Sequence, residues 1–403
     1  VKVTLKPVAA EPGNIIVVLG IVEQSTGSIS GGLGYSQSQG VFGQIQLNDS
    51  NLAGRAWDLG TNISYGQFGG LGDITFSNPW IKGDKYRTSM RTRVFFSREL
   101  PQIYQSQNNG FFSTVVEGSE PAQSTGNQVA IQRLGASVQF VRPLNGGDPF
   151  KKAPWNIILA FGGQQVTPLD FTGAISSRAI APNGKIVCIA YNCATENQLL
   201  SFRVGSTYST VDDPRNPTKG NFFTASTEQF LSVGPNSPTF NRLRTSFTHY
   251  IPVNWIKLYK GCRAKPGETP DCKQALAFQA TAGTLIGDIP PYEAFCLGGG
   301  NSVRGYFDCD LGVGKSIAEA TIEYRFPLFK IISGELFFDA GTTFGTQQDV
   351  PGNLGGVLGK SGDGYSVGTG LIVTTPVGPL RLEVATQDFT SNYRFNLGVG
   401  WKF

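Results

Sequence analysis

Charged residues are scarce in this chain. Asp, Glu, Lys and Arg make up 15% of its 403 residues, whereas an ordinary soluble domain contains about 25%. The sequence also holds a single methionine and a single histidine. One histidine excludes most histidine-based metal sites and catalytic triads, and the strand-like surroundings of His249 favour an interface residue. We therefore expect no enzyme activity, no metal and no cofactor.

Long apolar runs are absent as well. A transmembrane helix needs about 20 apolar residues, and the longest apolar stretch, Ile15–Leu19, is far shorter. The net charge of +4 is too small to indicate a nucleic-acid partner. No signal-peptide pattern is visible, because the sequence opens with the strand-like Val1–Leu5. We expect the chain to start inside a domain.

Glycine and aromatic residues are abundant instead, at 52 residues and 11%, which suits strands and turns better than helices. The cysteines form pairs that are close in sequence, in segments that we expect to be loops. An even count with local spacing indicates disulfides in an oxidising compartment rather than a metal site, although the connectivity stays open. The candidate disulfide residues are Cys188, Cys193, Cys262, Cys272, Cys296 and Cys309.

The last eleven residues alternate between two classes of side chain. The apolar set is Tyr393, Phe395, Leu397, Val399, Trp401 and Phe403. The interleaved polar or small set is Arg394, Asn396, Gly398, Gly400 and Lys402. A period of two with a single apolar face indicates a strand that is half buried.

The same period recurs along the whole chain. It is visible at 27–36, 41–49, 56–66, 86–96, 127–144, 198–210, 240–252, 273–285, 318–326 and 363–375. We expect about sixteen strands, an even number as in bacterial transmembrane barrels. A soluble β-sandwich also alternates, but strands of about ten residues suit a tilted crossing of a bilayer. The predicted fold is all-β, with a transmembrane antiparallel β-barrel at 25–403.

Connection lengths support the same fold. Long connections near 101–126, 169–197, 286–315 and 345–362 interleave with short turns near 52–55, 81–85 and 329–332, and only 253–272 is long on the short side. One long rim and one short rim are typical of outer-membrane barrels. Basic residues on the polar faces indicate either a solvated lumen wall or a lining that touches an unfolded client; they are Arg87, Arg91, Arg93, Arg203, Arg242 and Arg244.

Several short motifs, in one order, resemble the BamA-type family of outer-membrane assembly and translocation barrels. They are Glu23–Gly40, Asn78-Pro79-Trp80, Asp212–Gly220, Val303–Tyr306, Phe337–Gly341, Gly378-Pro379-Leu380 and Trp401-Lys402-Phe403. The resemblance implies a 16-stranded barrel preceded by periplasmic POTRA modules. Residues 1–24, which read as two strands joined by a turn, would then be the C-terminal end of an incomplete POTRA module.

The resemblance also implies a first site, in the loop 286–315. In the family this loop folds into the barrel, and its motif here is Val303, Arg304, Gly305 and Tyr306. The family's arginine pairs with acids on the inner wall, and we expect Glu323 and Asp339 as partners of Arg304. Alternation independently places both acids on the polar faces of their strands. The pair is either a static anchor for the loop or a latch that moves during client passage.

A second site is the seam between the first and last barrel strands. The glycines in these strands are Gly31, Gly32, Gly34, Gly398 and Gly400. Glycine weakens a strand and permits kinks, and family members are thought to open this seam so that a client strand pairs with the exposed edge. The alternative is that these glycines only fit the curvature of the barrel.

The function implied is the assembly and insertion of β-barrel proteins into the outer membrane of a Gram-negative-type, cyanobacterial-like bacterium. Expected partners are unfolded outer-membrane clients, the lipid bilayer, and periplasmic chaperones or accessory proteins. One alternative is a polypeptide translocation pore of the two-partner secretion or plastid-import type. Another is a passive porin, which would give the family motifs no role.

Overall fold

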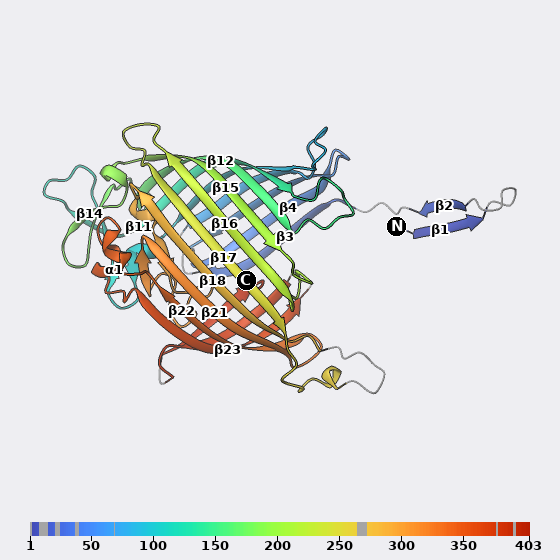
Figure 1. Cartoon of the computed structure of the whole chain (residues 1–403). Coiled ribbons are helices and arrows are strands. Elements are labelled where there is room, and N and C mark those ends of the chain that lie inside the picture. The colour runs from blue at the N-terminus through green and yellow to red at the C-terminus, as the bar shows by residue number, and fades with distance from the viewer. Residues whose placement is uncertain are drawn as a thin grey trace.

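A computed structural model of the whole chain gives the arrangement in Figure 1. It describes residues 2–7, 15–20, 25–36, 40–67, 69–263, 272–375, 378–389 and 392–403. Its one α-helix in these ranges, α1 (Leu354–Val357), is a single turn. No helix in the described ranges has the length and the apolar content needed to cross a bilayer.

The first two strands form a separate hairpin. β1 (Lys2–Pro7) pairs antiparallel with β2 (Ile15–Gly20), and Figure 1 shows both apart from the barrel. Their apolar side chains, such as Val3 and Leu5, are exposed, as expected of a pair of strands that lacks a partner layer. The expected turn at 8–14 and residues 21–24 lie outside the described residues. The assignment of this hairpin to a POTRA module stays a prediction.

Sixteen long strands, counted over the described ranges, form the barrel sheet. They are β3 (Gly27–Ser36), β4 (Gly40–Leu52), β5 (Trp57–Gly66), β6 (Gly69–Asn78), β7 (Ser89–Glu99), β11 (Ser124–Pro143), β12 (Trp155–Asp170), β15 (Asn197–Ser209), β16 (Gly220–Leu231), β17 (Phe240–Pro252), β18 (Ala275–Gly287), β21 (Ser316–Pro327), β22 (Ile332–Thr342), β23 (Asp363–Thr375), β24 (Gly378–Thr386) and β25 (Tyr393–Val399). Each pairs antiparallel with the next long strand in the chain. The predicted transmembrane antiparallel barrel of about sixteen strands is confirmed.

Alternation along each strand separates a lipid-facing wall from a polar lumen. In β21, Ile322 is 43% exposed on the outside, whereas its neighbour Glu323 is fully buried on the inside. Successive side chains of a strand point to opposite faces, and charges on a lipid-facing wall are costly. The ladder bonds between strands satisfy the backbone groups that lipid cannot. Arg87 is an exception among the expected lumen residues, because it lies in the turn before β7 over the Trp80 ring.

The two rims differ as expected. Turns at 53–56, 79–88, 144–154, 210–219 and 328–331 lie on one rim with both chain ends, and only the connection at 253–274 is long there. The opposite rim carries 100–123, 171–196, 288–315 and 343–362. Figure 1 shows the N-terminus at one end of the barrel and α1 at the other.

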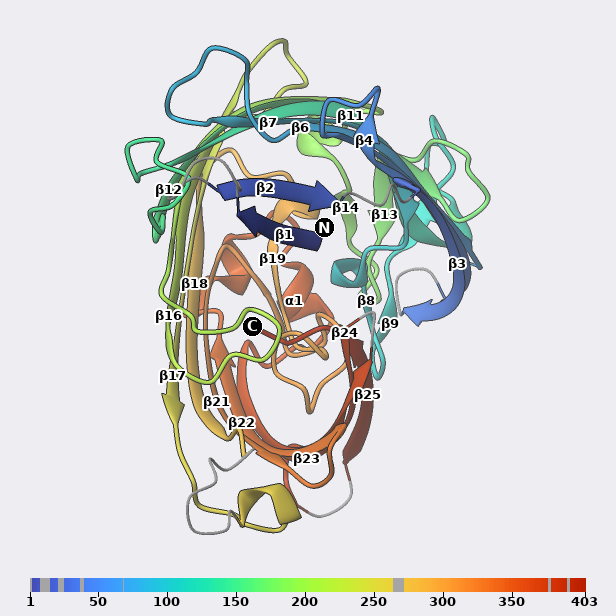
Figure 2. The ribbon, with the colours of Figure 1, turned by 90° about the vertical axis from the view of Figure 1, so that its right-hand side faces the viewer.

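Three of the long connections, 100–123, 171–196 and 343–362, form what we call the cap. Short elements shape it: η1 (Gln102–Tyr104), β8 (Gln105–Ser106), β9 (Gly110–Phe111), β10 (Ser113–Val115), β13 (Arg178–Ile180), β14 (Ile186–Cys188), η2 (Tyr191–Cys193), η5 (Thr346–Asp349) and α1. Cap side chains such as Tyr104, Ile189 and Leu354 share one buried apolar cluster with wall residues such as Ile131 and Leu285. Figure 2 looks along the barrel and shows α1 and β14 inside the ring of strands. The cap therefore covers the mouth of the lumen.

Lys360 is an ionisable side chain inside the cap. It is only 5% exposed, and its Nζ donates to the carbonyl of Gln102 at 3.2 Å. Burial lowers the pKa of Lys360 from 10.5 to about 7. Between these two values an opened, hydrated cap binds a proton that the closed cap does not, so cap closure strengthens as pH rises through this window.

We expect Lys360→Met to abolish this pH dependence. In the wild type, closure gains up to about 1.4 kcal/mol per pH unit, or about tenfold slower opening-limited cleavage. The measurement is the rate of proteolysis within 343–362 between pH 7 and 10.5, normalised to an unstructured peptide. Lys185→Met, at an exposed lysine of the cap, should behave like the wild type. An unchanged pH profile in Lys360→Met would contradict this assignment.

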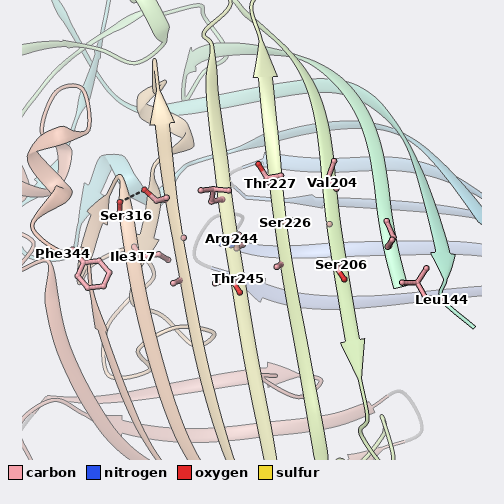
Figure 3. Close-up of a pocket in the computed structure, with 17 residues that line it drawn as sticks. Leu144, Val204, Ser206, Ser226, Thr227, Arg244, Thr245, Ser316, Ile317 and Phe344 are labelled. Carbon is pink, nitrogen blue, oxygen red and sulfur yellow. Dashed lines mark hydrogen bonds between the residues drawn. The ribbon is translucent and has the colours of Figure 1, made fainter. Parts of the chain in front are cut away.

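The outer wall is hollowed where its side chains are small. A groove of about 830 Å³ crosses β15 to β21 on the lipid-facing side, and Figure 3 shows side chains that line it, including Ser206, Thr227 and Thr245. Larger residues also line it, among them Leu144 and Phe344. Serine and threonine side chains are short, so they leave room for this hollow in the outer wall.

Candidate functional site: the lumen loop and the seam

The loop 286–315, which we call the lumen loop, connects β18 to β21. It contains η4 (Pro291–Glu293), β19 (Phe295–Leu297) and β20 (Gly312–Gly314), and β19 pairs with β20. A disulfide between Cys296 and Cys309 closes its base. Gly298 and Gly299 have φ angles of +106° and +107°, a region that favours glycine. Figure 2 shows β19 within the ring of strands, so the loop enters the barrel.

Arg304 is the central side chain of the lumen loop, and it is fully buried. Its Nε and Nη2 donate to the two carboxylate oxygens of Asp339 at 2.8 and 3.0 Å. Its Nη1 donates to Glu323 at 3.0 Å and to Glu383 at 2.9 Å. The structure thus brings the expected partners together and adds a third acid from β24. The guanidinium also lies over the Phe337 ring, 3.3 Å from the centroid.

Each of these three acids is shared with a second cation. Arg325 Nε donates to Glu323 at 2.6 Å, Arg381 Nη1 to Glu383 at 2.9 Å, and Lys402 Nζ to Asp339 at 2.8 Å. Removing one partner of a buried ion pair leaves an uncompensated charge, which costs about 3 to 5 kcal/mol. The cluster is therefore sensitive to the loss of any single member.

The motif residues beside Arg304 fix the loop backbone. Val303 packs with Leu297, Leu311 and Tyr306 in a small apolar cluster. At Gly305 an added Cβ would lie 2.6 Å from Ser366 Cβ, so any larger residue would push the loop off the wall. The Gly305 carbonyl accepts from Gln387 Nε2 at 2.8 Å, and the Arg304 carbonyl accepts from Asn396 Nδ2 at 3.0 Å.

A second ion-pair cluster, which the sequence did not reveal, holds the base of the lumen loop. Glu293 of η4 accepts from Arg133 Nη1 of β11 at 2.6 Å and also from Arg242 Nη2 of β17. Arg133 lies over the Tyr292 ring, and Tyr292 donates to Asn197 at 2.9 Å. Arg242 was already placed on a polar strand face. The sequence did not indicate where the Glu293 side chain points, because Glu293 lies outside the strands and their alternation.

The expected course of the last strand is wrong at its end. β25 stops at Val399, and Gly400, with φ of +89°, turns the chain. Trp401 and Phe403 were expected to continue the apolar face of the strand, yet both rings lie over the inward-facing Arg325. Figure 2 accordingly shows the C-terminus within the ring of strands. Glycine permits the positive φ that breaks the strand period here.

The seam residues lie at the two ends of the sheet ladder. Registers run without a break from β3 through the other long strands to β25, and the sheet order returns β25 to the side of β3. β3 and β25 are the first and last barrel strands, so no turn of the chain connects them. Their outer side chains are strongly exposed: Leu33 is 88% and Phe395 83% exposed, against 45% for Leu371 in β23.

The five seam glycines have different local roles. Gly31, Gly32 and Gly34 lie in β3, in register with β4. At Gly398 an added Cβ would lie 2.7 Å from Arg381 Nη2, so this glycine lets Arg381 cross beneath β25. Gly400 makes the turn at the end of β25.

All six cysteines form disulfides within their sequence pairs: Cys188–Cys193, Cys262–Cys272 and Cys296–Cys309. Cys188 and Cys296 belong to the short strands β14 and β19 rather than to irregular loop. These strands lie within long connections, because the cap and the lumen loop carry pairings of their own.

Comparison with known proteins identifies the family to which this barrel belongs. The Omp85 superfamily domain matches residues 51–403. The chain is 29% identical over 407 residues to the chloroplastic outer envelope protein 80 of Arabidopsis thaliana, covering 97% of this chain and 48% of that protein. It is 34% identical over 160 residues to the chloroplastic protein TOC75-3 of Arabidopsis thaliana, covering 40% of this chain and 18% of that protein. The chain thus spans about half or less of these relatives.

A solved structure shares the fold. BamA from Haemophilus ducreyi lacking POTRA domains 1–3 aligns with a TM-score of 0.62 and 16% identity, over 98% of this chain and 73% of that one. At this identity the likeness concerns the fold alone.

Proposed function

Because this chain belongs to the Omp85 superfamily of outer-membrane β-barrels, we propose that it inserts unfolded β-barrel proteins into an outer membrane through the seam between β3 and β25. The client strand would pair with a free strand edge by β-augmentation. No nucleotide or cofactor enters this proposal, since folding of the client supplies the free energy. The partners would be the client chain, the bilayer, and periplasmic chaperones or accessory proteins.

The observation that carries the proposal is the contrast between a filled lumen and a junction of the wall that no turn of the chain closes. The cap covers one mouth through a shared apolar cluster, and the lumen loop is bonded to three strands through Arg304. A straight path for a polypeptide is therefore occupied. By contrast, β3 and β25 are the first and last barrel strands and no turn connects them, so the sideways path requires the least disruption.

The membrane that we propose is the outer membrane of a cyanobacterial-type cell. Support comes from the chloroplastic outer envelope proteins among the relatives and from the three disulfides, which suit an oxidising compartment. The runner-up is a translocation pore, which requires the lumen loop and the cap to move aside. A passive porin is disfavoured, because a filled lumen does not give steady conductance.

The test is reconstitution in liposomes with a urea-unfolded barrel client. We expect client that is protease-protected and heat-modifiable to accumulate faster than in protein-free liposomes. A soluble passenger added in parallel should stay outside. Delivery of the passenger into the vesicles, with barrel client left unfolded, would instead establish the translocation pore.

A further inference from the structure

The last four residues leave the barrel wall and cross its lumen. At the turn, the Gly400 N–H donates to Pro379 O at 2.7 Å, and Arg381 Nε donates to Gly400 O at 2.9 Å. Both contacts come from β24, which pairs in register with β25. The chain therefore departs from the seam edge in a direction that its neighbour fixes.

Lys402 ends in the acid cluster of the lumen loop. Its side chain is 2% exposed, and its Nζ donates to Asp339 at 2.8 Å, to Thr321 Oγ1 at 3.0 Å and to the Ser302 carbonyl at 2.6 Å. The three donor positions of an ammonium group are thus all used. One acceptor belongs to the lumen loop, and Asp339 is the acid that also binds Arg304.

The flanking residues reach the wall opposite the seam. Trp401 Nε1 donates to Arg215 O in the turn between β15 and β16 at 2.8 Å. The Phe403 carbonyl accepts from Tyr250 of β17 at 2.8 Å. The guanidinium of Arg325 lies between these two rings, 4.3 Å from the Trp401 centroid and 5.1 Å from that of Phe403.

We propose that residues 400–403 form a strut that couples β25 at the seam to the lumen loop, with Lys402 as its positioning residue. This coupling would serve the proposed insertion of client proteins, and only this role depends on the proposed function. Outward movement of β25 withdraws Lys402 from Asp339 and removes one of its two cations. Ser302 loses its bond to the strut in the same step. Opening of the seam thereby loosens the loop, and a loosened loop releases the seam.

The strut also restrains the end of the barrel strand that borders the seam. A strand edge that opens in lipid has unsatisfied backbone groups, and no turn of the chain connects β25 to β3. The bonds of Lys402, Trp401 and Phe403 restrain its end from inside the lumen instead. Lys402→Met removes the charge and three hydrogen bonds but keeps an unbranched apolar chain of similar length. Lys402→Arg keeps the charge.

The experiment measures two distances by pulsed electron resonance on the reconstituted protein without client. One label pair, at Leu33→Cys and Phe395→Cys, spans the seam on the exposed outer face. The other, at Asn301→Cys and Arg91→Cys, spans the lumen from the loop to β7. All six native cysteines are bonded, so label attaches only to the introduced ones. We expect both distributions to broaden and to shift to longer distance in Lys402→Met, and Lys402→Arg to retain the wild-type seam distribution.

Two results would overturn the coupling: unchanged distributions in Lys402→Met, or a broadened seam pair with an unchanged loop pair. Tyr250→Phe serves as a second variant, since it removes only the hydroxyl that holds Phe403 and should broaden the seam pair to a lesser degree. Heat-modifiability of each variant shows that its barrel has folded. Because no client is present, the distances report on the strut even where insertion activity fails.

Discussion

Arg304→Lys and Arg304→Ala are expected to lose most client insertion while the barrel still folds. Arg304 donates to three acids through a planar, branched group, and an ammonium on a single stem cannot reach Glu323, Asp339 and Glu383 in this geometry. Loss of a buried pairing worth about 3 to 5 kcal/mol shifts the population of the bound loop by on the order of 100-fold or more. Lysine should therefore resemble alanine rather than the wild type.

The measurement combines insertion rate with barrel folding. Insertion is scored with the unfolded client in liposomes, and folding is scored by heat-modifiability of the variant itself. Barrel yield should stay close to wild type, because every ladder of the sixteen strands is independent of Arg304. Arg55→Ala changes an exposed arginine in the turn between β4 and β5 and is the matched control. Normal insertion by Arg304→Ala at normal yield would remove this residue from the site.

Glu293→Gln is expected to detach the base of the lumen loop and weaken the cap. The substitution leaves Arg133 and Arg242 without their shared carboxylate, at a cost of about 3 kcal/mol. Because Glu293 lies in η4, beside the apolar cluster of the cap, the loss should appear first as faster proteolysis within 171–196 and 343–362. Glu120→Gln, at an exposed position of the cap, is the matched control.

The same carboxylate also predicts that the protection of the cap from proteolysis depends on pH. Burial alone would raise the pKa of Glu293, but Arg133 and Arg242 outweigh it and hold the pKa below the ordinary value of 4.5. A lowered pKa in the closed cap adds stability that is present above pH 4.5 and is lost as the pH falls through the lowered value. Wild-type protection should therefore decline in acid, and Glu293→Gln should lack that component. Equal proteolysis of Glu293→Gln and wild type near pH 7 would contradict the assignment.

Side-chain alternation made the wall predictable. A period of two gives the direction of every side chain in a strand once one direction is known. It therefore placed Glu323 and Asp339 in the lumen from the sequence alone. Glu383 obeys the same period in β24. It was missed because alternation gives the face of a residue and not its depth in the barrel, which depends on register across strands that lie far apart in sequence.

The contacts of Trp401, Phe403 and Glu293 were not predicted, because they do not alter the periodicity of the sequence. Trp401 and Phe403 continue the alternation of β25, since aromatic rings suit both a lipid-facing wall and a contact with Arg325 in the lumen. Only Gly400 marked the turn, and glycine is frequent throughout this chain. Glu293 lies in a short loop element where neither helical nor strand period specifies direction. Contacts between loops therefore required the folded structure.

The seam has a further consequence through chain connectivity. Fifteen of the sixteen junctions between neighbouring barrel strands are joined by the polypeptide itself, and the junction of β25 with β3 is the exception. Parting two strands elsewhere stretches a covalent link, whereas parting β3 from β25 stretches none. The proposed opening site is thus the one junction between barrel strands that has no connecting turn. Joining β25 to β3 and cutting another turn would move the weak junction around the ring with no change of residue in the wall.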